Sequence, residues 1–151
     1  MFGLKDDDIV ADLGAGTGFY SLAAGYITER GKVYAIEIAK EFLQMLKSKV
    51  KDARLRNVEI IWGNIEKSGG TQLGDDTMDK AIISNVFSQI EDKEQFILET
   101  KRILKTKGRV LFVDWSPLSF MAQKKSLPKD KVFELFEKKG FILERDINVG
   151  G

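Results

Sequence analysis

The sequence predicts an α/β fold, a three-layer sandwich in which helices cover both faces of a mostly parallel sheet. Short apolar runs alternate along the chain with longer segments of helical periodicity, as in consecutive βαβ units. The first run, residues 8–13, ends at three closely spaced glycines, Gly14, Gly16 and Gly18. With 151 residues, 43% of them hydrophobic, the chain can bury one sizeable core but not two.

The alternation defines each element in turn. We expect six strands, at residues 8–13, 32–37, 57–62, 79–86, 109–115 and 141–148. Between them we expect helices at residues 17–29, 39–52, 91–106 and 129–139, joined by right-handed crossovers. The last strand differs from the others because apolar and polar residues alternate along it, which indicates one solvent-facing side near the edge of the sheet.

The glycine segment after the first strand is the most informative motif. An apolar strand, a tight glycine turn and the start of an amphipathic helix follow one another between Val10 and Tyr20. Glycine tolerates positive φ and lets the backbone approach a ligand closely, while the helix N-terminus offers free N–H groups and a positive dipole. The pattern favours a nucleotide-like ligand over an ordinary strand–helix turn of an α/β protein.

The glycine spacing distinguishes between classes of nucleotide. A dinucleotide site of the NAD type has the pattern G-x-G-x-x-G, but this chain has G-x-G-x-G and places Phe19 at the third glycine of that pattern. Asp12, two residues before Gly14, would repel a pyrophosphate and would suit a cationic amino-acid group. Both features disfavour a dinucleotide-binding oxidoreductase, which remains the less favoured alternative.

Residues Asp12–Gly18 resemble the first motif of the class I S-adenosylmethionine (SAM) dependent methyltransferases, which have a Rossmann-like fold. The segment Arg102–Arg109 resembles the family's R-x-L-K-P-G-G-x approach to its fifth strand, with Thr106 and Lys107 in place of the proline and the first glycine. The resemblance runs in order from residue 9 to about residue 148. It implies transfer of a methyl group from SAM, by in-line displacement, to an unidentified acceptor that we expect to be a small molecule.

The resemblance implies a set of donor-binding residues. Gly14 and Gly16 would approach the methionine part of SAM, and Asp12 would fix its ammonium group. Glu37, about twenty residues after the glycine turn, would take the ribose hydroxyls. Asn64, where the family commonly has an acid, would accept from the adenine amino group. The expected set is Asp12, Gly14, Gly16, Glu37, Ile38, Asn64, Ile65 and Asn85, with Ile65 against the adenine ring and Asn85 at the carboxyl end of the fourth strand.

The acceptor side is less well defined by the sequence. Ser88 and Gln89 stand where many relatives carry a histidine, and their alternative role is simply to end the strand. Asp114, at the end of the fifth strand, is a weak candidate for a general base if the acceptor must lose a proton. The catalytic residue is otherwise unknown.

We expect residues 1–151 to form a single SAM-binding domain without the family's N-terminal cap helices and C-terminal seventh strand. A fragment, a minimal variant and a domain completed by a partner chain all fit this expectation. An uncovered strand edge favours pairing, so a homodimer is expected. The same features keep open a SAM-binding or inactive assembly module.

Composition excludes several other classes. The net charge of +1 provides no broad basic surface for nucleic acid. No apolar stretch is long enough to span a bilayer and no signal-peptide pattern opens the chain, so a cytoplasmic protein without membrane partners is expected. The absence of cysteine and histidine excludes disulfides, thiol nucleophiles and thiolate zinc sites, and we expect no metal.

Overall fold

The computed structural model describes residues 2–114 and 126–148. They form a five-stranded parallel sheet in the order β3-β2-β1-β4-β5, which confirms the predicted α/β class. The strands are β1 (Ile9–Leu13), β2 (Lys32–Glu37), β3 (Val58–Trp62), β4 (Met78–Ser84) and β5 (Leu104–Val113). The helices are α1 (Phe19–Ile27), α2 (Lys40–Asp52), α3 (Lys93–Ile103) and α4 (Lys129–Glu137), with a short 3-10 helix at Phe87–Gln89.

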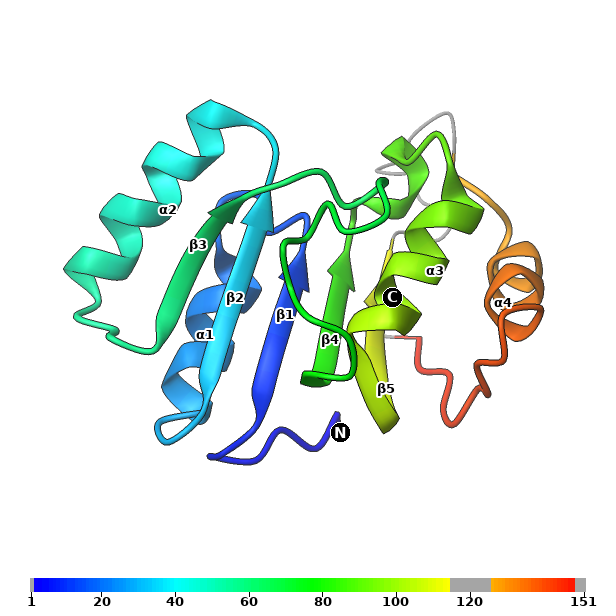
Figure 1. The fold of residues 1–151 in the computed structure, drawn as a ribbon, viewed down its shortest axis with the longest axis horizontal. Helices are drawn as coiled ribbons and strands as arrows, with labels where there is room; N and C mark the ends of the chain where they lie inside the picture. The colour runs from blue at the N-terminus through cyan, green and yellow to red at the C-terminus, as the bar shows by residue number, and fades with distance from the viewer. Residues whose placement is uncertain (1, 115–125, 149–151) are drawn as a thin grey trace.

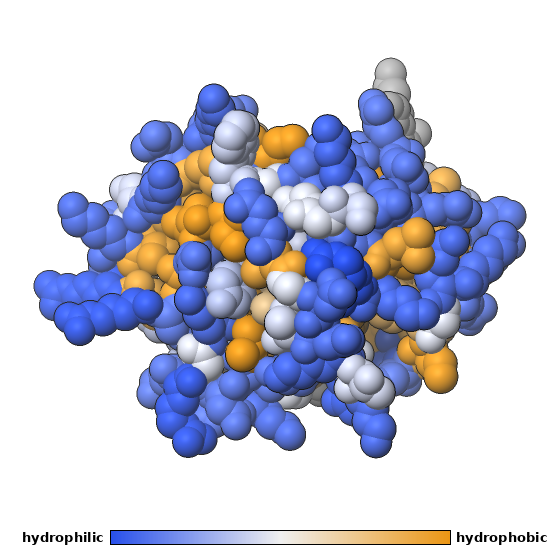
Figure 2. All heavy atoms as spheres, viewed as in Figure 1, coloured by the Kyte–Doolittle hydropathy of each residue, from blue (hydrophilic) through white to orange (hydrophobic). Residues whose placement is uncertain are grey.

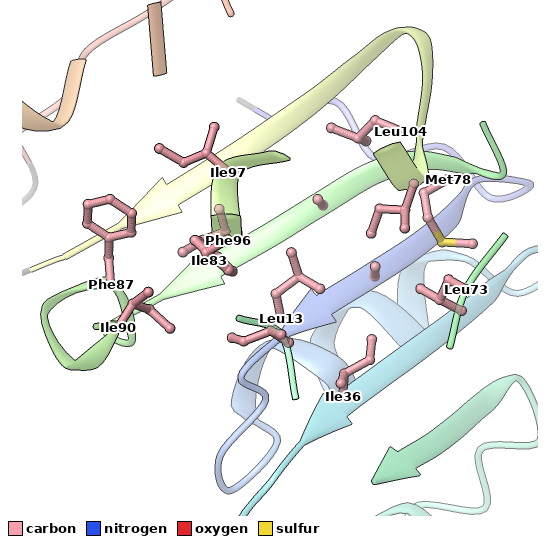
Figure 3. Packing of buried hydrophobic residues seen from close by; sticks show 14 of the residues in the cluster. Leu13, Ile36, Leu73, Met78, Ile83, Phe87, Ile90, Phe96, Ile97 and Leu104 are labelled. Carbon is pink, nitrogen blue, oxygen red and sulfur yellow. The ribbon is translucent and has the colours of Figure 1, made fainter. Parts of the chain in front are cut away.

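Helices cover both faces of the sheet, with α1 behind it and α3 in front of it in Figure 1. Successive residues of a strand point to opposite faces. Val10 of β1 therefore packs with Ala24 of α1, while Ile83 of β4 belongs to the larger cluster that includes Phe96 of α3 (Figure 3). Apolar residues on both faces of the central strands hold the three layers together.

Apolar side chains reach the surface mainly beside α2 and β3, while hydrophilic side chains cover most of the remaining face in Figure 2. The exposed apolar residues of these elements are Phe42, Met45 and Trp62. In the part of the chain that the structure describes, every helix is too short or too polar to cross a bilayer.

Several element boundaries differ from the sequence prediction, and two of the differences have identifiable reasons. Helix α1 starts at Phe19 rather than residue 17, because Gly18 adopts a φ of 90° and forms the N-cap. Strand β5 starts at Leu104 rather than residue 109, because Leu104 already pairs with Met78 before the chain bulges out. Lys107, with a φ of 67°, lies within this irregular stretch.

The expected sixth strand at residues 141–148 is wrong, since these residues have no regular structure. Phe141 packs its ring 5.4 Å from that of Phe136, so the chain follows α4 when it leaves the helix. Beyond this point residues 142–148 are exposed, and Ile142 is 87% exposed. The alternating pattern therefore has no buried face to define a strand.

A buried carboxylate anchors the long connection between β3 and β4. Glu99 of α3 accepts hydrogen bonds from Gly69 N (2.9 Å) and Thr71 Oγ1 (2.7 Å), and Arg102 Nη2 lies 2.7 Å from the same carboxylate. These interactions outweigh the effect of burial and hold the pKa of Glu99 at about 2. The connection, which crosses the carboxyl edge of the sheet, is thereby tied to α3.

We predict that Glu99→Gln lowers the unfolding free energy by about 3 kcal/mol at pH 7, the value that corresponds to the lowered pKa. The Glu99 contribution is complete above the unfolded pKa of 4.5 and is lost as the pH falls towards 2. Urea unfolding at pH 7 and pH 3 measures the difference. Glu94→Gln, an exposed change in the first turn of the same helix, is the control. A penalty for Glu99→Gln that does not shrink at pH 3 would contradict the prediction.

Candidate functional site

The candidate site lies at the carboxyl ends of the parallel strands, where β1 and β4 are neighbours. The chain leaves β1 towards β2 and leaves β4 towards β5, so the following loops diverge from this point. Ligands of open α/β sheets bind in such a crevice. Two hydrogen bonds shape the turn after β1, because the Ile36 carbonyl accepts from Gly14 N (2.9 Å) and Ala15 N (3.0 Å).

The first two glycines of this turn have different roles. Gly14 has a φ of 76°, and a Cβ added there would lie 2.7 Å from Val86 Cγ2 in the loop after β4. Gly16 has a φ of 56°, but a Cβ added there would meet no atom within 4 Å. Gly14 is therefore required by packing, whereas Gly16 borders open space that a ligand can enter.

Glu37 lies directly beside this open space. Its Oε2 accepts from Gly16 N at 2.8 Å, and its Oε1 accepts from Ile38 N (2.9 Å) and Ala39 N (3.0 Å). A carboxylate has about four lone-pair positions, so Oε2 can accept one further hydrogen bond. The structure therefore brings together the predicted residues Gly16 and Glu37, and fixes the carboxylate before any ligand arrives.

Asp12, at the end of β1, is buried beneath α1. Its Oδ2 accepts from Ser21 Oγ at 2.6 Å, a contact that no sequence pattern indicated. Burial raises the pKa of Asp12 to about 6, and the nearby Glu37 charge acts in the same direction. A cationic group bound nearby would favour the ionised form of this carboxylate.

The predicted residues after β2 and β3 differ in exposure. Ile38 is 56% exposed, whereas Ile65 is 8% exposed and belongs to the larger core cluster. Asn64 lies between them in exposure, and its Oδ1 accepts from Glu66 N at 3.0 Å. The structure therefore leaves Ile38 and Asn64 accessible and gives Ile65 mainly a packing role.

Asn85 and Asp114 lie at the ends of the neighbouring strands β4 and β5. Asn85 has a φ of 52°, and its backbone N–H donates to the Val113 carbonyl at 2.8 Å. Asp114, the next residue after Val113, is half-buried. The structure thus places both predicted residues along the same edge as the glycine turn.

The sequence did not indicate that the loop after β3 is hydrogen-bonded to the segment just before α3. The Glu66 carboxylate, in the loop after β3, accepts from Glu91 N (2.6 Å) and Asp92 N (3.0 Å) just before α3. Nothing in the sequence singles out Glu66, because its partners lie 25 and 26 residues away. Among the described residues, no cluster of acidic side chains could hold a metal ion.

A family model described as a methyltransferase domain matches residues 4–146. The chain belongs to the class I, SAM-dependent methyltransferase family. The resemblance based on the Asp12–Gly18 motif is confirmed. SAM is the methyl donor of this family.

The relatives support the same assignment. A demethylmenaquinone methyltransferase of Bacillus mycoides is 31% identical over 114 residues, which are 75% of this chain and 47% of that protein. A Sulfurisphaera tokodaii protein named "Probable cobalt-precorrin-6B C(15)-methyltransferase (decarboxylating)" is 32% identical over 101 residues, 66% of this chain and 50% of that one. The crystal structure of a SAM-dependent methyltransferase from Aquifex aeolicus has a TM-score of 0.87 and 28% identity, covering 95% of this chain and 77% of that one. The chain spans about half the length of these two curated relatives.

We predict that Asp12→Asn stabilises the domain at pH 7.5 and not at pH 4. The raised pKa means that stability falls as the pH rises from 3.8 through about 6, by about 3 kcal/mol in total. An amide removes the buried charge and keeps an oxygen that can accept from Ser21 Oγ. Urea unfolding at both pH values tests this, and an equal effect at the two values would contradict it.

We also predict that Gly16→Ala weakens ligand binding more than it weakens the fold. The cost to stability is about 1 kcal/mol, from an L residue at positive φ. The added methyl group, however, occupies the open space next to Glu37. Gly14→Ala is the matched comparison, because its methyl group meets Val86 and costs more stability. Thermal unfolding and SAM titration of both variants measure the two effects, and equal stability losses would refute the distinction.

Proposed function

We propose that this chain is a SAM-dependent methyltransferase acting on a small-molecule acceptor, with the donor bound along the carboxyl edge of β1, β2 and β3. The observation that carries the proposal is the open space at Gly16 beside the fixed carboxylate of Glu37. A side chain at residue 16 would fill this space. Relatives named for demethylmenaquinone and precorrin substrates support a small-molecule acceptor.

The residues of the site suit the parts of SAM. The free lone pair of Glu37 Oε2 can accept from a ribose hydroxyl, and Asp12 provides negative charge for the amino-acid ammonium. Gly14 and Gly16 have positive φ and no side chain, so the turn backbone can lie close along the methionine part of SAM. Ile38 and Asn64 provide an apolar and a polar group for adenine, and Ile65 supports them from the core.

When bound, the donor supplies a methyl group already activated by its sulfonium, so the protein mainly holds the acceptor in line and excludes water. Asn85 would face the transferred group from the end of β4. Asp114 would take a proton from the acceptor if the acceptor must lose one.

The proposal treats residues 1–151 as one SAM-binding domain working in the cytoplasm. Within the described residues, β5 pairs with β4 alone, and its other edge can pair with a second copy of the chain. Sedimentation of the purified chain at increasing concentration tests the homodimer.

We predict that SAM and S-adenosylhomocysteine bind with micromolar affinity in calorimetric titrations, and that NAD does not bind. Glu37→Gln should weaken both ligands about tenfold or more, because a hydrogen bond to a charged group is lost. Glu41→Gln, an exposed change in the first turn of α2, should leave binding unchanged.

Each contrary result has a distinct meaning. Binding of NAD alone would replace the proposal with a dinucleotide-binding oxidoreductase. SAM binding without transfer to any acceptor would favour an assembly module.

A further inference from the structure

We infer that Ser21 of α1 is a positioning residue for the methyl donor, because its buried hydroxyl holds the Asp12 carboxylate in the ionised form beneath the glycine turn. The inference rests on the proposed function and adds a residue that acts through Asp12 rather than on the ligand. Ser21 Oγ donates to Asp12 Oδ2 at 2.6 Å, and Ser21 is 0% exposed. The hydrogen bond joins the first turn of α1 to the end of β1.

The Ser21 hydroxyl differs in its partner from other buried hydroxyls of the described helices. A serine or threonine within a helix often donates to the carbonyl four residues earlier. Thr100 in α3 and Thr28 at the end of α1 both do so, each with Oγ1 2.9 Å from that carbonyl oxygen. Ser21 instead donates outside its own helix, to a side chain of the central strand. Its hydroxyl therefore serves Asp12 and not the helix that carries it.

The N-terminus of α1 also favours a negative charge at Asp12. The N-cap residue, Gly18, provides no side chain to accept from the free N–H groups of the first turn. Burial raises the pKa of Asp12 to about 6, and hydrogen bonds from the hydroxyl and the backbone N–H of Ser21 oppose that rise. Ser21 thus supplies two donors to one buried carboxylate.

The surroundings of Asp12 make this support necessary. In the sheet, Asp12 is paired with Ala35 of β2 and Ile82 of β4, and neither has a polar side chain. Glu37 is the one titratable group of the described chain that shifts the pKa of Asp12, and its charge raises that pKa. Without the Ser21 hydroxyl, a larger fraction of Asp12 is protonated. A protonated carboxyl group has no charge with which to bind the donor ammonium.

The test is the affinity for S-adenosylhomocysteine at pH 5 and at pH 7, measured by calorimetric titration. The ammonium and the carboxylate of this ligand keep their charges over that range. If the ligand binds only when Asp12 is ionised, the wild-type affinity should fall about tenfold from pH 7 to pH 5, because the pKa of Asp12 is about 6. Asp12→Asn removes the titrating group and should abolish most of this pH dependence.

Ser21→Ala should weaken binding about twofold at pH 7 and about tenfold at pH 5, because loss of the hydroxyl moves the midpoint of the profile up by about one pH unit. A loss of packing alone would weaken binding by the same factor at both pH values. Thr28→Val is the matched control, since it removes a buried hydroxyl from the other end of α1 and should keep the wild-type profile. Ser21→Cys retains a weak donor of similar size and should have an intermediate midpoint.

The outcomes separate this inference from the proposed function. If the wild-type chain does not bind S-adenosylhomocysteine at pH 7, the proposed function fails. If it binds and Ser21→Ala has the wild-type profile, or a loss that is equal at the two pH values, the inference is overturned and the donor site stands. A wild-type affinity that is the same at pH 5 and pH 7 also overturns it. Circular dichroism at both pH values checks the fold of each variant, and Ser21→Cys decides if Ser21→Ala is unfolded.

Discussion

The Glu37 carboxylate accepts hydrogen bonds from three backbone N–H groups. These hydrogen bonds organise the carboxyl edge of the sheet. Ile38 and Ala39 bind the carboxylate from its own turn, and Gly16 binds it from the loop after the neighbouring strand. One buried side chain thus sets the distance between the glycine turn and the end of β2. Because these bonds form within the protein, the remaining lone pair of Oε2 is already oriented, and a ligand does not have to order it.

This arrangement has an electrostatic cost, which a cationic ligand would reduce. Asp12 and Glu37 are both buried, and none of the groups that shift the pKa of Asp12 is a cation. The ionised form of Asp12 is therefore disfavoured in the protein alone. Elsewhere the fold avoids this cost, since Glu99 is paired with Arg102 and Asp8 lies 3.2 Å from Lys80. The one buried carboxylate with a strongly raised pKa in the described chain lies where the donor ammonium is proposed to bind, as expected of a functional site.

The sequence predicted the parts of the fold that depend on local patterns. The glycine turn and the first five strands were recognised because turn chemistry and apolar runs are encoded within a few residues. The expected strand at residues 141–148 failed because only Phe141 is partly buried, against Phe136 of α4, and the exposed residues after it have no partner strand. The early start of β5 could not be foreseen either, since it depends on Leu104 pairing with Met78 across the sheet.

The same distinction divides the site. The positions of Gly16 and Glu37 follow from motif and spacing, but the orientation of Asn64 depends on Glu66, and Glu66 depends on residues at the start of α3. The loop after β3 is therefore hydrogen-bonded to the segment just before α3. Glu66 is the side chain that joins the two loops. The contact between these two loops joins segments far apart in the chain, which a one-dimensional motif does not describe.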